Sequence, residues 1–200
     1  MSELRRAAMD SDPFAQLQLW VNDAERAGIA ESNALCVSSV DSAGQPSSRM
    51  VLLRGLDSRG LIFYTSYFSR KGREFTQNPK IAALLFWPSL HRQVRIEGSV
   101  SALSDDESDA YFAARPRGHQ LGAWASEQSE PVESRELLDR RIEDYEARFE
   151  GEEVPRPHSW GGYLIKPAQL EFWQAQPNRM HDRIVYRAQG HLWTTQRLQP

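Results

Sequence analysis

Three cationic side chains recur at alternate positions near the end of the chain, at Arg179, His181 and Arg183. On a β-strand, side chains two residues apart point to the same face, so a strand here would place all three in one row. Met180 and Asp182 would then point to the opposite face. Such a row is either a solvated edge of a sheet or a binding site for an anionic group.

A second group of cations stands at the predicted start of a short helix. Ser69 is a typical N-cap, and the helix would run from Arg70 until Pro79 stops it. Lys71 and Arg73 join Arg70 in the first turn, where cations oppose the helix dipole at a cost of roughly a few tenths of a kcal/mol each. A bound anion would reverse this cost, because the free N–H groups and the basic side chains would all face it. The segment therefore indicates either a phosphate site or a solvated basic turn, and without a Walker motif it does not indicate a nucleoside triphosphate.

The third group, residues 111–129, mixes basic, aromatic and amide side chains. Tyr111 and Arg115 are four residues apart on a helix that the capping box at 104–107 predicts, and hence share one face. An Arg-Pro-Arg-Gly turn then leads into a Gly- and Trp-rich segment that ends in a Gln-Ser pair. This composition fits the lining of an anion-binding pocket, and it equally fits a polar surface turn.

A strand predicted over residues 47–55 carries Arg49 and Arg54 near its two ends and is apolar on both faces between them. That pattern predicts a strand buried in its middle, with its charged ends at a rim of the sheet. By itself the pattern is weak evidence for a site, because most arginines at strand ends lie at solvated sheet edges.

Other common chemistries lack support in the sequence. No second histidine pair at ligand spacing accompanies His181, so no metal site is expected, and no nucleophile-elbow or dinucleotide-binding motif occurs. The single cysteine, Cys36, excludes an internal disulfide. A net charge of −3 gives no general attraction to nucleic acid or membranes. With no apolar signal segment and no run long enough to span a membrane, we expect a cytoplasmic protein.

The elements that must position these residues predict one α+β domain, residues 13–200, after a flexible N-terminal segment, residues 1–12. Turns recur roughly every 8–12 residues, which is typical of an antiparallel sheet that curls into a barrel. Helix signals follow Asp12 and the capping box, and a charged helix is predicted over 133–151. We expect strands over residues 34–40, 47–55, 61–66, 80–87, 91–103, 163–174, 179–187 and 191–198.

Several separated motifs extend over nearly the whole chain: RMVLLR from residue 49, FYTSYFSRKGRE from 63, RQVRIEG from 92, YFAARPRGHQLGAWASEQS from 111, EFWQ from 171 and RMHDR from 179. In this order and spacing they resemble the pyridoxine/pyridoxamine 5′-phosphate oxidase family. The resemblance implies an FMN-binding split β-barrel with flanking helices, assembled as a homodimer with FMN at the subunit interface. It also implies oxidation of pyridoxamine and pyridoxine 5′-phosphates to pyridoxal 5′-phosphate, with O2 as acceptor and H2O2 as product.

The resemblance assigns roles by position. It implies that Arg179 and His181 lie over the substrate ring and are the catalytic residues. The implied substrate-binding residues are Arg54, Tyr111, Arg115, His119, Arg179 and His181. The implied FMN-binding residues, some of them contributed across the dimer interface, are Arg49, Met50, Val51, Leu52, Leu53, Tyr64, Thr65, Arg70, Lys71, Gln93, Gln128, Ser129, Trp173 and Arg183.

Two positions in the substrate-phosphate set depart from the family pattern, which usually has lysine at Arg54 and serine at His119. Arginine is longer and planar, so the first exchange is not neutral at a shaped phosphate site, and histidine can change charge near neutral pH. Two alternatives therefore stay open. One is a related split-barrel flavin oxidase acting on another anionic aromatic substrate, as in phenazine biosynthesis. The other is a non-catalytic protein that binds flavin or pyridoxal phosphate.

Overall fold

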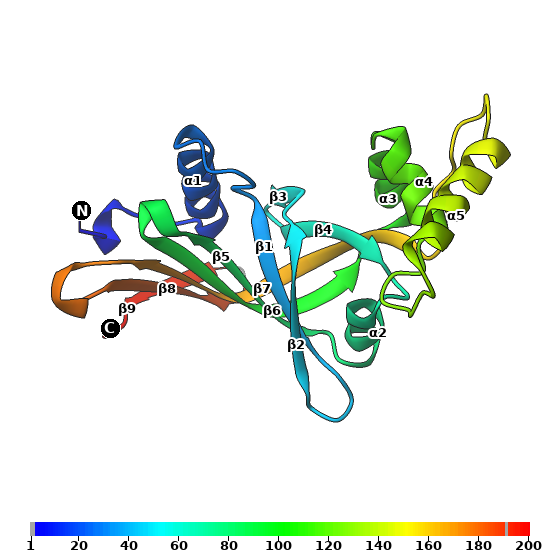
Figure 1. The fold of residues 1–200 in the computed structure, drawn as a ribbon. Coiled ribbons are helices and arrows are strands. Elements are labelled where there is room, and N and C mark those ends of the chain that lie inside the picture. Colours follow the sequence, from blue (N-terminus) through cyan, green and yellow to red (C-terminus); the bar gives the residue numbers. More distant parts are fainter. Residues whose placement is uncertain (1–2, 191) are drawn as a thin grey trace.

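The computed structural model describes residues 3–190 and 192–200, whose strands form one curled antiparallel sheet (Figure 1). Within these residues the strand order is β2-β1-β5-β6-β7-β4-β3, and β8 and β9 continue from β7. The α+β class with an antiparallel sheet is thus as the sequence predicts. The strands are β1 Ala34–Val40, β2 Pro46–Leu52, β3 Gly55–Asp57, β4 Gly60–Ser66, β5 Lys80–Trp87, β6 Arg92–Ala102, β7 Trp160–Gln174, β8 Asp182–Gln189 and β9 Leu192–Arg197.

The long strand β7 joins the two ends of the sheet, because three strands pair with it. Its first part pairs with β4, its last part with β8, and most of its length with β6. The register between β6 and β7 shifts at Gly98, where a β-carbon would lie 2.2 Å from the carbonyl oxygen of Lys166. Glycine therefore permits this irregularity, and such a bulge bends and twists the strands that carry it.

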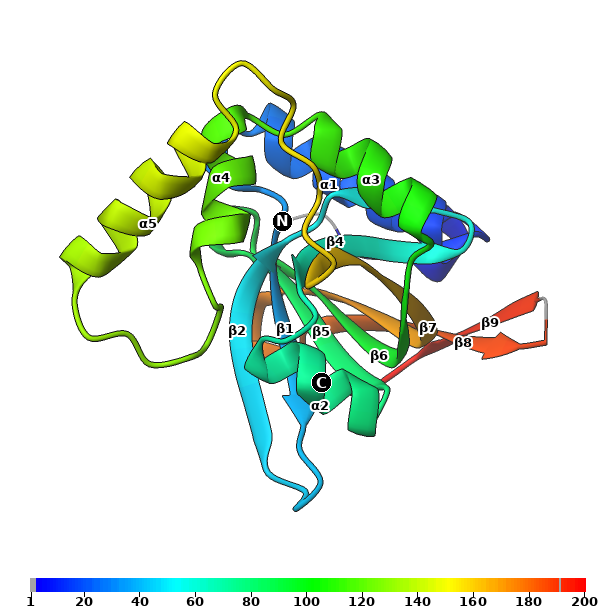
Figure 2. The ribbon, with the colours of Figure 1, turned by 90° about the vertical axis from the view of Figure 1, so that its right-hand side faces the viewer.

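Except for α2, the helices gather at two ends of the curled sheet (Figure 1). Helix α1 packs at one end, whereas α3, α4 and α5 stand together at the other, and α2 lies across the lower edge of the barrel in Figure 2. The helices are α1 Pro13–Arg26, α2 Arg70–Gln77, α3 Asp105–Ala113, α4 Arg117–Ala125 and α5 Arg135–Arg148, with short 3₁₀ turns at Arg6–Ala8, Pro88–Leu90 and Pro177–Arg179.

Two clusters of buried apolar side chains hold these elements. The larger fills the curled sheet and includes Trp20 of α1 edge-to-face with Phe172 of β7, their ring centroids 5.0 Å apart. The smaller lies under α3, α4 and α5 and includes Trp160 at the start of β7. Trp160 contacts Phe112 of α3, so the helical end of the molecule is fixed to the sheet by aromatic packing.

Local capping signals in the sequence are confirmed. The Asp12 carboxylate accepts a hydrogen bond from the Phe14 N–H at 2.9 Å, and Gly28, with φ of +70°, follows the end of α1. The capping box of Ser104 and Glu107 starts α3 as predicted. Each of these signals depends only on residues within one turn of the helix, which is why the sequence reveals them.

The predicted strand over 179–187 is wrong in its first part. Residues 177–179 form a 3₁₀ turn in which Asn178 and Arg179 have φ values of 57° and 61°. Strand β8 begins only at Asp182. The left-handed backbone breaks the period of two, so Arg179 and Arg183 do not belong to one strand row.

Two further predictions need correction. The predicted strand over 47–55 ends at Leu52, and its middle is not buried within this chain, because β2 is an edge strand and Met50 is 61% exposed. The segment after Arg115 is a regular helix, α4, which the sequence interpretation took for a turn and a loop. Its two glycines weaken the helical signal.

The N-terminal segment has defined contacts in its described part. The Leu4 side chain is buried, its N–H donates to the Asp182 carboxylate at 2.9 Å, and its carbonyl accepts from Arg197 at 2.6 Å. Residues 1 and 2 of the predicted flexible segment, and His191 of the last predicted strand, lie outside the described residues. The flexibility of residues 1–12 stays a prediction. None of the helices described is long and apolar enough to cross a membrane.

Candidate functional site

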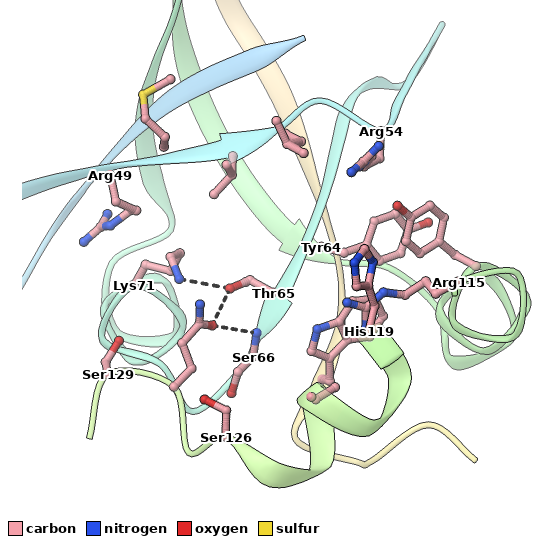
Figure 3. A pocket seen from close by; sticks show the side chains of 18 of the residues that line it. Arg49, Arg54, Tyr64, Thr65, Ser66, Lys71, Arg115, His119, Ser126 and Ser129 are labelled. Carbon is pink, nitrogen blue, oxygen red and sulfur yellow. Dashed lines mark hydrogen bonds between the residues drawn. The ribbon is translucent and has the colours of Figure 1, made fainter. Parts of the chain in front are cut away.

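One cavity of about 1110 Å³ collects most of the predicted site residues (Figure 3). Its walls come from β2, β4, the start of α2 and the segment from α3 through α4 to residue 129. These elements are far apart in the chain, so the cavity exists only because the sheet curls. The predicted residues that line it are Arg49, Met50, Val51, Leu52, Arg54, Tyr64, Thr65, Arg70, Lys71, Tyr111, Arg115, His119, Gln128 and Ser129.

Cations stand at two separate ends of this cavity (Figure 3). We call the first the α2 end, defined by Arg49, Arg70 and Lys71, and the second the α4 end, defined by Arg54, Arg115 and His119. The apolar side chains of β2, which stand between Arg49 and Arg54 in the chain, line the wall between the two ends. The phenol rings of Tyr64 and Tyr111 lie at the α4 end (Figure 3). The arrangement can bind one anionic group at each end, with flat ring systems lying between the two groups.

At the α2 end, a buried lysine is set in a chain of hydrogen bonds. Lys71 Nζ donates to Thr65 Oγ1 at 2.9 Å and to Ser69 Oγ at 3.2 Å. Thr65 Oγ1 in turn donates to Gln128 Oε1 at 2.9 Å, and that oxygen also accepts from the Ser66 N–H. Burial, with the nearby charge of Arg49, lowers the pKa of Lys71 to about 8. An anion here would favour the charged form of Lys71.

Ser69 caps α2 as predicted, because its hydroxyl accepts from the Gly72 N–H at 3.3 Å. The first turn of α2 therefore lies at the cavity, which Arg70 and Lys71 of this turn line. No acidic residue lies in that turn. Gly72 allows the turn to pack closely, since a β-carbon would lie 2.1 Å from the Tyr67 carbonyl oxygen. This is the geometry in which helix N-termini bind phosphate.

At the α4 end, the guanidinium carbon of Arg115 lies over the Trp160 ring, 4.4 Å from its centroid. Its Nη1 is buried and has no hydrogen-bond partner among the described residues. Burial and the positive charge of Arg54 lower the pKa of the Arg115 guanidinium, against an opposing contribution from Tyr111. A buried donor without an acceptor is costly, so this atom indicates that a ligand oxygen belongs beside it.

The tyrosines of the α4 end form a stacked pair. The Tyr64 and Tyr111 rings are nearly parallel, at 6°, with centroids 3.6 Å apart, and Trp160 continues the stack 5.5 Å from Tyr64. The prediction placed Tyr111 and Arg115 on one helix, but α3 ends at Ala113. Both side chains still line the cavity, because the turn after α3 directs Arg115 toward it.

The other predicted site residues lie outside the cavity. We call the five polar and aromatic members the C-terminal group: Gln93, Trp173, Arg179, His181 and Arg183. The sixth residue, Leu53, is part of the buried core. Within the C-terminal group, three members sit directly opposite one another on neighbouring strands, Gln93 on β6, Trp173 on β7 and Arg183 on β8.

Side chains in the C-terminal group contact each other and the buried Glu171. The His181 ring lies 4.8 Å from the Trp173 ring, and Arg183 forms a two-point ion pair with the Glu171 carboxylate at 2.8 and 3.0 Å. His181 Nδ1 accepts a hydrogen bond from the Gln176 N–H at 3.1 Å. An acceptor nitrogen carries no proton, so the neutral ring has its hydrogen on Nε2 and presents a donor there.

Family models match most of the chain. One described as pyridoxamine 5′-phosphate oxidase matches residues 21–149, and one described as the pyridoxine 5′-phosphate oxidase C-terminal dimerisation region matches residues 160–200. This chain belongs to the pyridoxine/pyridoxamine 5′-phosphate oxidase family. It is 54% identical over 191 residues to the oxidase of that name from Rubrobacter xylanophilus, covering 96% of this chain and 88% of the other. With the one from Cupriavidus taiwanensis it shares 49% over 201 residues, 100% of this chain and 94% of the other.

Two solved structures have a similar fold. PhzG from Burkholderia lata, in complex with tetrahydrophenazine-1-carboxylic acid, is similar with a TM-score of 0.93 at 33% identity, covering 100% of this chain and 98% of its own. A pyridoxamine 5′-phosphate oxidase-related, FMN-binding protein from Nostoc punctiforme has a TM-score of 0.75 over 96% of this chain and all of its own. At 16% identity the second supports the fold alone. The predicted split-barrel fold is confirmed.

The family comparison also separates the two groups of site residues. Four members of the C-terminal group lie in the region matched as the oxidase family's dimerisation region, and only Gln93 lies before it. The cavity, apart from Trp160, is built from residues before that region. The chain therefore carries a dimerisation region on which most of the remaining predicted site residues lie.

Several cavity residues were missed by the sequence interpretation. Trp160 was read only as part of a rigid loop, although it supports Arg115 and stacks with both tyrosines. No local signal marks it, because its partners are distant in the chain. Ser47, Ser66 and Ser126 also line the cavity, and serines of that kind cannot be told from surface serines without the fold.

Proposed function

We propose that this protein oxidises pyridoxamine 5′-phosphate and pyridoxine 5′-phosphate to pyridoxal 5′-phosphate, with FMN as cofactor, O2 as electron acceptor and H2O2 as product. The observation that carries the proposal is a single cavity with cations at two separate ends. A phosphorylated cofactor and a phosphorylated substrate, bound side by side, would require two such ends. The names of relatives that share about half of this sequence support the same reaction.

The α2 end fits the phosphate of FMN. It combines the free N–H groups at the start of α2 with the side chains of Arg70 and Lys71, which are the donors that phosphate prefers. The neighbouring wall of β2, from Met50 to Leu52, offers an apolar surface and strand backbone to a flat ring. No group of three or more metal-ligating side chains occurs among the described residues, and the proposed reaction needs no metal.

The α4 end fits the phosphate of the substrate. Its unpaired Arg115 Nη1 would donate to a phosphate oxygen, and the contact with the Trp160 ring holds that guanidinium at the cavity beforehand. Arg54 and His119 add donors from two other elements. Because phosphate carries several acceptor oxygens, convergence from three directions fixes both its position and its orientation.

When bound, FMN supplies the acceptor for the hydride that leaves C4′ of the substrate. The protein's own residues bind, orient and exclude water. The two ends of the cavity hold the two phosphates at a fixed separation, and this brings the reacting rings together between them. We propose that Arg179 and His181 hold the substrate ring from its other side, with His181 donating through Nε2–H.

We further propose that the active form is a homodimer in which the C-terminal group of one copy completes the cavity of the other. In one copy this group does not line the cavity, and four of its five members lie in the dimerisation region. The arginines of this group and the Trp173 ring would contact the flavin and the substrate ring. The exposed Met50 on the edge strand β2 agrees with a contact to a second copy.

A steady-state assay on the purified protein tests the proposal. The FMN-loaded protein is expected to form pyridoxal 5′-phosphate and peroxide from both phosphorylated vitamers, and its flavin to bleach when substrate is added without oxygen. Absence of product from both vitamers would contradict the proposed reaction. A flavin that binds but never bleaches would identify a non-catalytic binder.

The second candidate is oxidation of another anionic aromatic compound. The Arg54 and His119 departures are the observation that favours this candidate, whereas PhzG, with its bound tetrahydrophenazine-1-carboxylic acid, is only 33% identical and does not outweigh the named oxidases. Competing that acid against pyridoxamine 5′-phosphate in the same assay separates the two. If the tricyclic acid is oxidised faster than the vitamer, the acid and not the vitamer is the preferred substrate.

A further inference from the structure

A buried carboxylate lies directly behind the α2 end. Glu74, in the second turn of α2, is 4% exposed and does not itself line the cavity. Its two oxygens accept hydrogen bonds from two hydroxyls, those of Ser39 and Ser47, and from the guanidinium groups of Arg49 and Arg70. All four partners are donors, so Glu74 is held as an anion.

By its charge alone, a carboxylate behind the α2 end opposes the binding of a phosphate there. Burial raises the pKa of Glu74, but the hydrogen bonds from Ser39, Arg70 and Ser47 and the charge of Arg49 outweigh it and lower the pKa to about 2. The carboxylate is therefore ionised at neutral pH. Burying a charge is costly unless it is paired and hydrogen-bonded, and Glu74 meets that condition through groups that stand at the cavity.

The geometry shows what Glu74 does for its partners. Arg70 donates through Nε to Glu74 Oε1 at 2.8 Å, which leaves both of its Nη groups unused by this pair. Arg49 donates through Nη2 to Glu74 Oε2 at 3.3 Å and through Nη1 to Ser39 Oγ at 2.6 Å. An arginine otherwise samples many rotamers, so a second anchor at its head reduces the entropy that it loses on binding a ligand.

We propose that Glu74 is a positioning residue for the phosphate end of the flavin site, which it serves by fixing Arg49 and Arg70 at the cavity. Its net effect on the binding of a phosphorylated flavin is favourable in spite of its charge. Ser39 belongs to the same hydrogen-bond network, because it donates to Glu74 and accepts from Arg49. The inference rests on the proposed function and goes beyond it, since it assigns a role to residues outside the cavity lining.

The decisive variant is Glu74→Gln, tested on the full-length protein freed of flavin. Both serine oxygens already accept from Arg49, so the new amide N–H₂ would face donors and displace at least one arginine. Fluorescence quenching then gives dissociation constants for FMN and for riboflavin, which lacks the phosphate. We expect the FMN constant to rise by about tenfold or more, and the riboflavin constant to stay within about twofold.

Other outcomes overturn the proposal. Unchanged or tighter FMN binding would mean that the charge of Glu74 dominates, and an equal loss for both flavins would mean that Glu74 only supports the fold. If neither flavin binds to the unmodified protein, the proposed function fails instead. The matched control is Glu97→Gln, an exposed carboxylate paired with Arg95 at 3.2 Å outside the cavity, which should change neither constant.

A second variant keeps the test decisive if Glu74→Gln does not fold. Ser39→Ala removes one donor to Glu74 and one acceptor of Arg49 while leaving the cavity lining intact. We expect FMN binding to weaken by about threefold with riboflavin binding unchanged. Equal affinities for FMN in Ser39→Ala and the unmodified protein would overturn the positioning role.

Discussion

The α2 end of the cavity and the C-terminal group both present cations, but this chain holds them differently. At the α2 end, Lys71 and the two arginines are tied to Thr65, Ser69 and Glu74, and they line the cavity of their own chain. In the C-terminal group, Arg183 is paired with Glu171, and His181 packs on Trp173 outside that cavity. A single chain can therefore build the phosphate sites, whereas the group assigned to the reacting rings needs a second copy under the proposed function.

Arg115→Ala should have the largest effect, because it removes the buried guanidinium from the α4 end. We expect kcat/KM for pyridoxamine 5′-phosphate to fall by about 100-fold, or about 2.7 kcal/mol, while FMN affinity is unchanged. Steady-state kinetics with a flavin titration measures both. Arg135→Ala, an exposed arginine of α5 paired with Asp139, is the control that should leave kcat/KM unchanged. A loss confined to FMN binding would contradict the division of the cavity.

Arg179→Ala tests the C-terminal group. Turnover should fall by about tenfold or more, about 1.4 kcal/mol, because the substrate ring loses its cationic contact while the protein stays folded. Near-normal kinetics would remove Arg179 from the site. Arg187→Ala, farther along β8, is the matched control and should retain turnover.

Mixing the two variants tests whether the groups meet between copies. A mixed dimer of Arg115→Ala and Arg179→Ala contains one cavity with both defects and one with neither. Activity should therefore rise above that of either variant alone after the two impaired proteins are unfolded together and refolded. No recovery would indicate that each chain supplies both groups to its own cavity.

Lys71 should make the α2 end sensitive to pH. Its pKa is lowered to about 8 in the ligand-free protein, so Lys71 loses its proton as the pH rises through 8, and FMN affinity should fall by up to about tenfold per pH unit above it. The unfolded chain keeps that proton up to about pH 10.5, so the free energy of unfolding should rise as the pH increases from about 8 to 10.5. Lys71→Arg should flatten the FMN affinity profile between pH 7.5 and about 9.5, because arginine stays charged.

His181 offers a finer test of the C-terminal group. If its Nε2–H donates to the substrate, glutamine, whose amide can place a donor near that position, should replace it better than asparagine. We expect about fivefold higher turnover for His181→Gln than for His181→Asn. Equal and severe losses in both variants, together with loss of a limb from the pH profile of kcat/KM, would indicate a base in place of a donor.

Arg54→Lys should have the smallest effect. Arg54 is exposed at the α4 end, where lysine can also contact a phosphate as a point charge. We expect kcat/KM within about threefold of the natural chain. A large gain would show that Arg54 weakens the phosphate site, and that result would favour a different substrate.

The two regions also differ in how well the sequence predicts them. The cap of α2 and the cations of its first turn were correctly placed, because capping depends on neighbours within a few residues. The cationic row at 179–183 was not, because the left-handed backbone at Asn178 and Arg179 interrupts the strand. Apolar periodicity does not report the left-handed conformation, and no glycine, the residue that usually signals it, stands at either position.

The sequence by itself determined the family, the antiparallel class of the sheet, the ends of most elements and the identity of the candidate residues. These depend on local hydrogen bonds, on apolar periodicity and on motif order, all of which are written along the chain. Only the tertiary structure decided which candidates share a cavity, that Trp160 supports Arg115, and that Glu74 holds Arg49 and Arg70. Except for the Arg70–Glu74 pair one helical turn apart, those contacts join residues far apart in the chain, and they form only when burial of the apolar core curls the sheet.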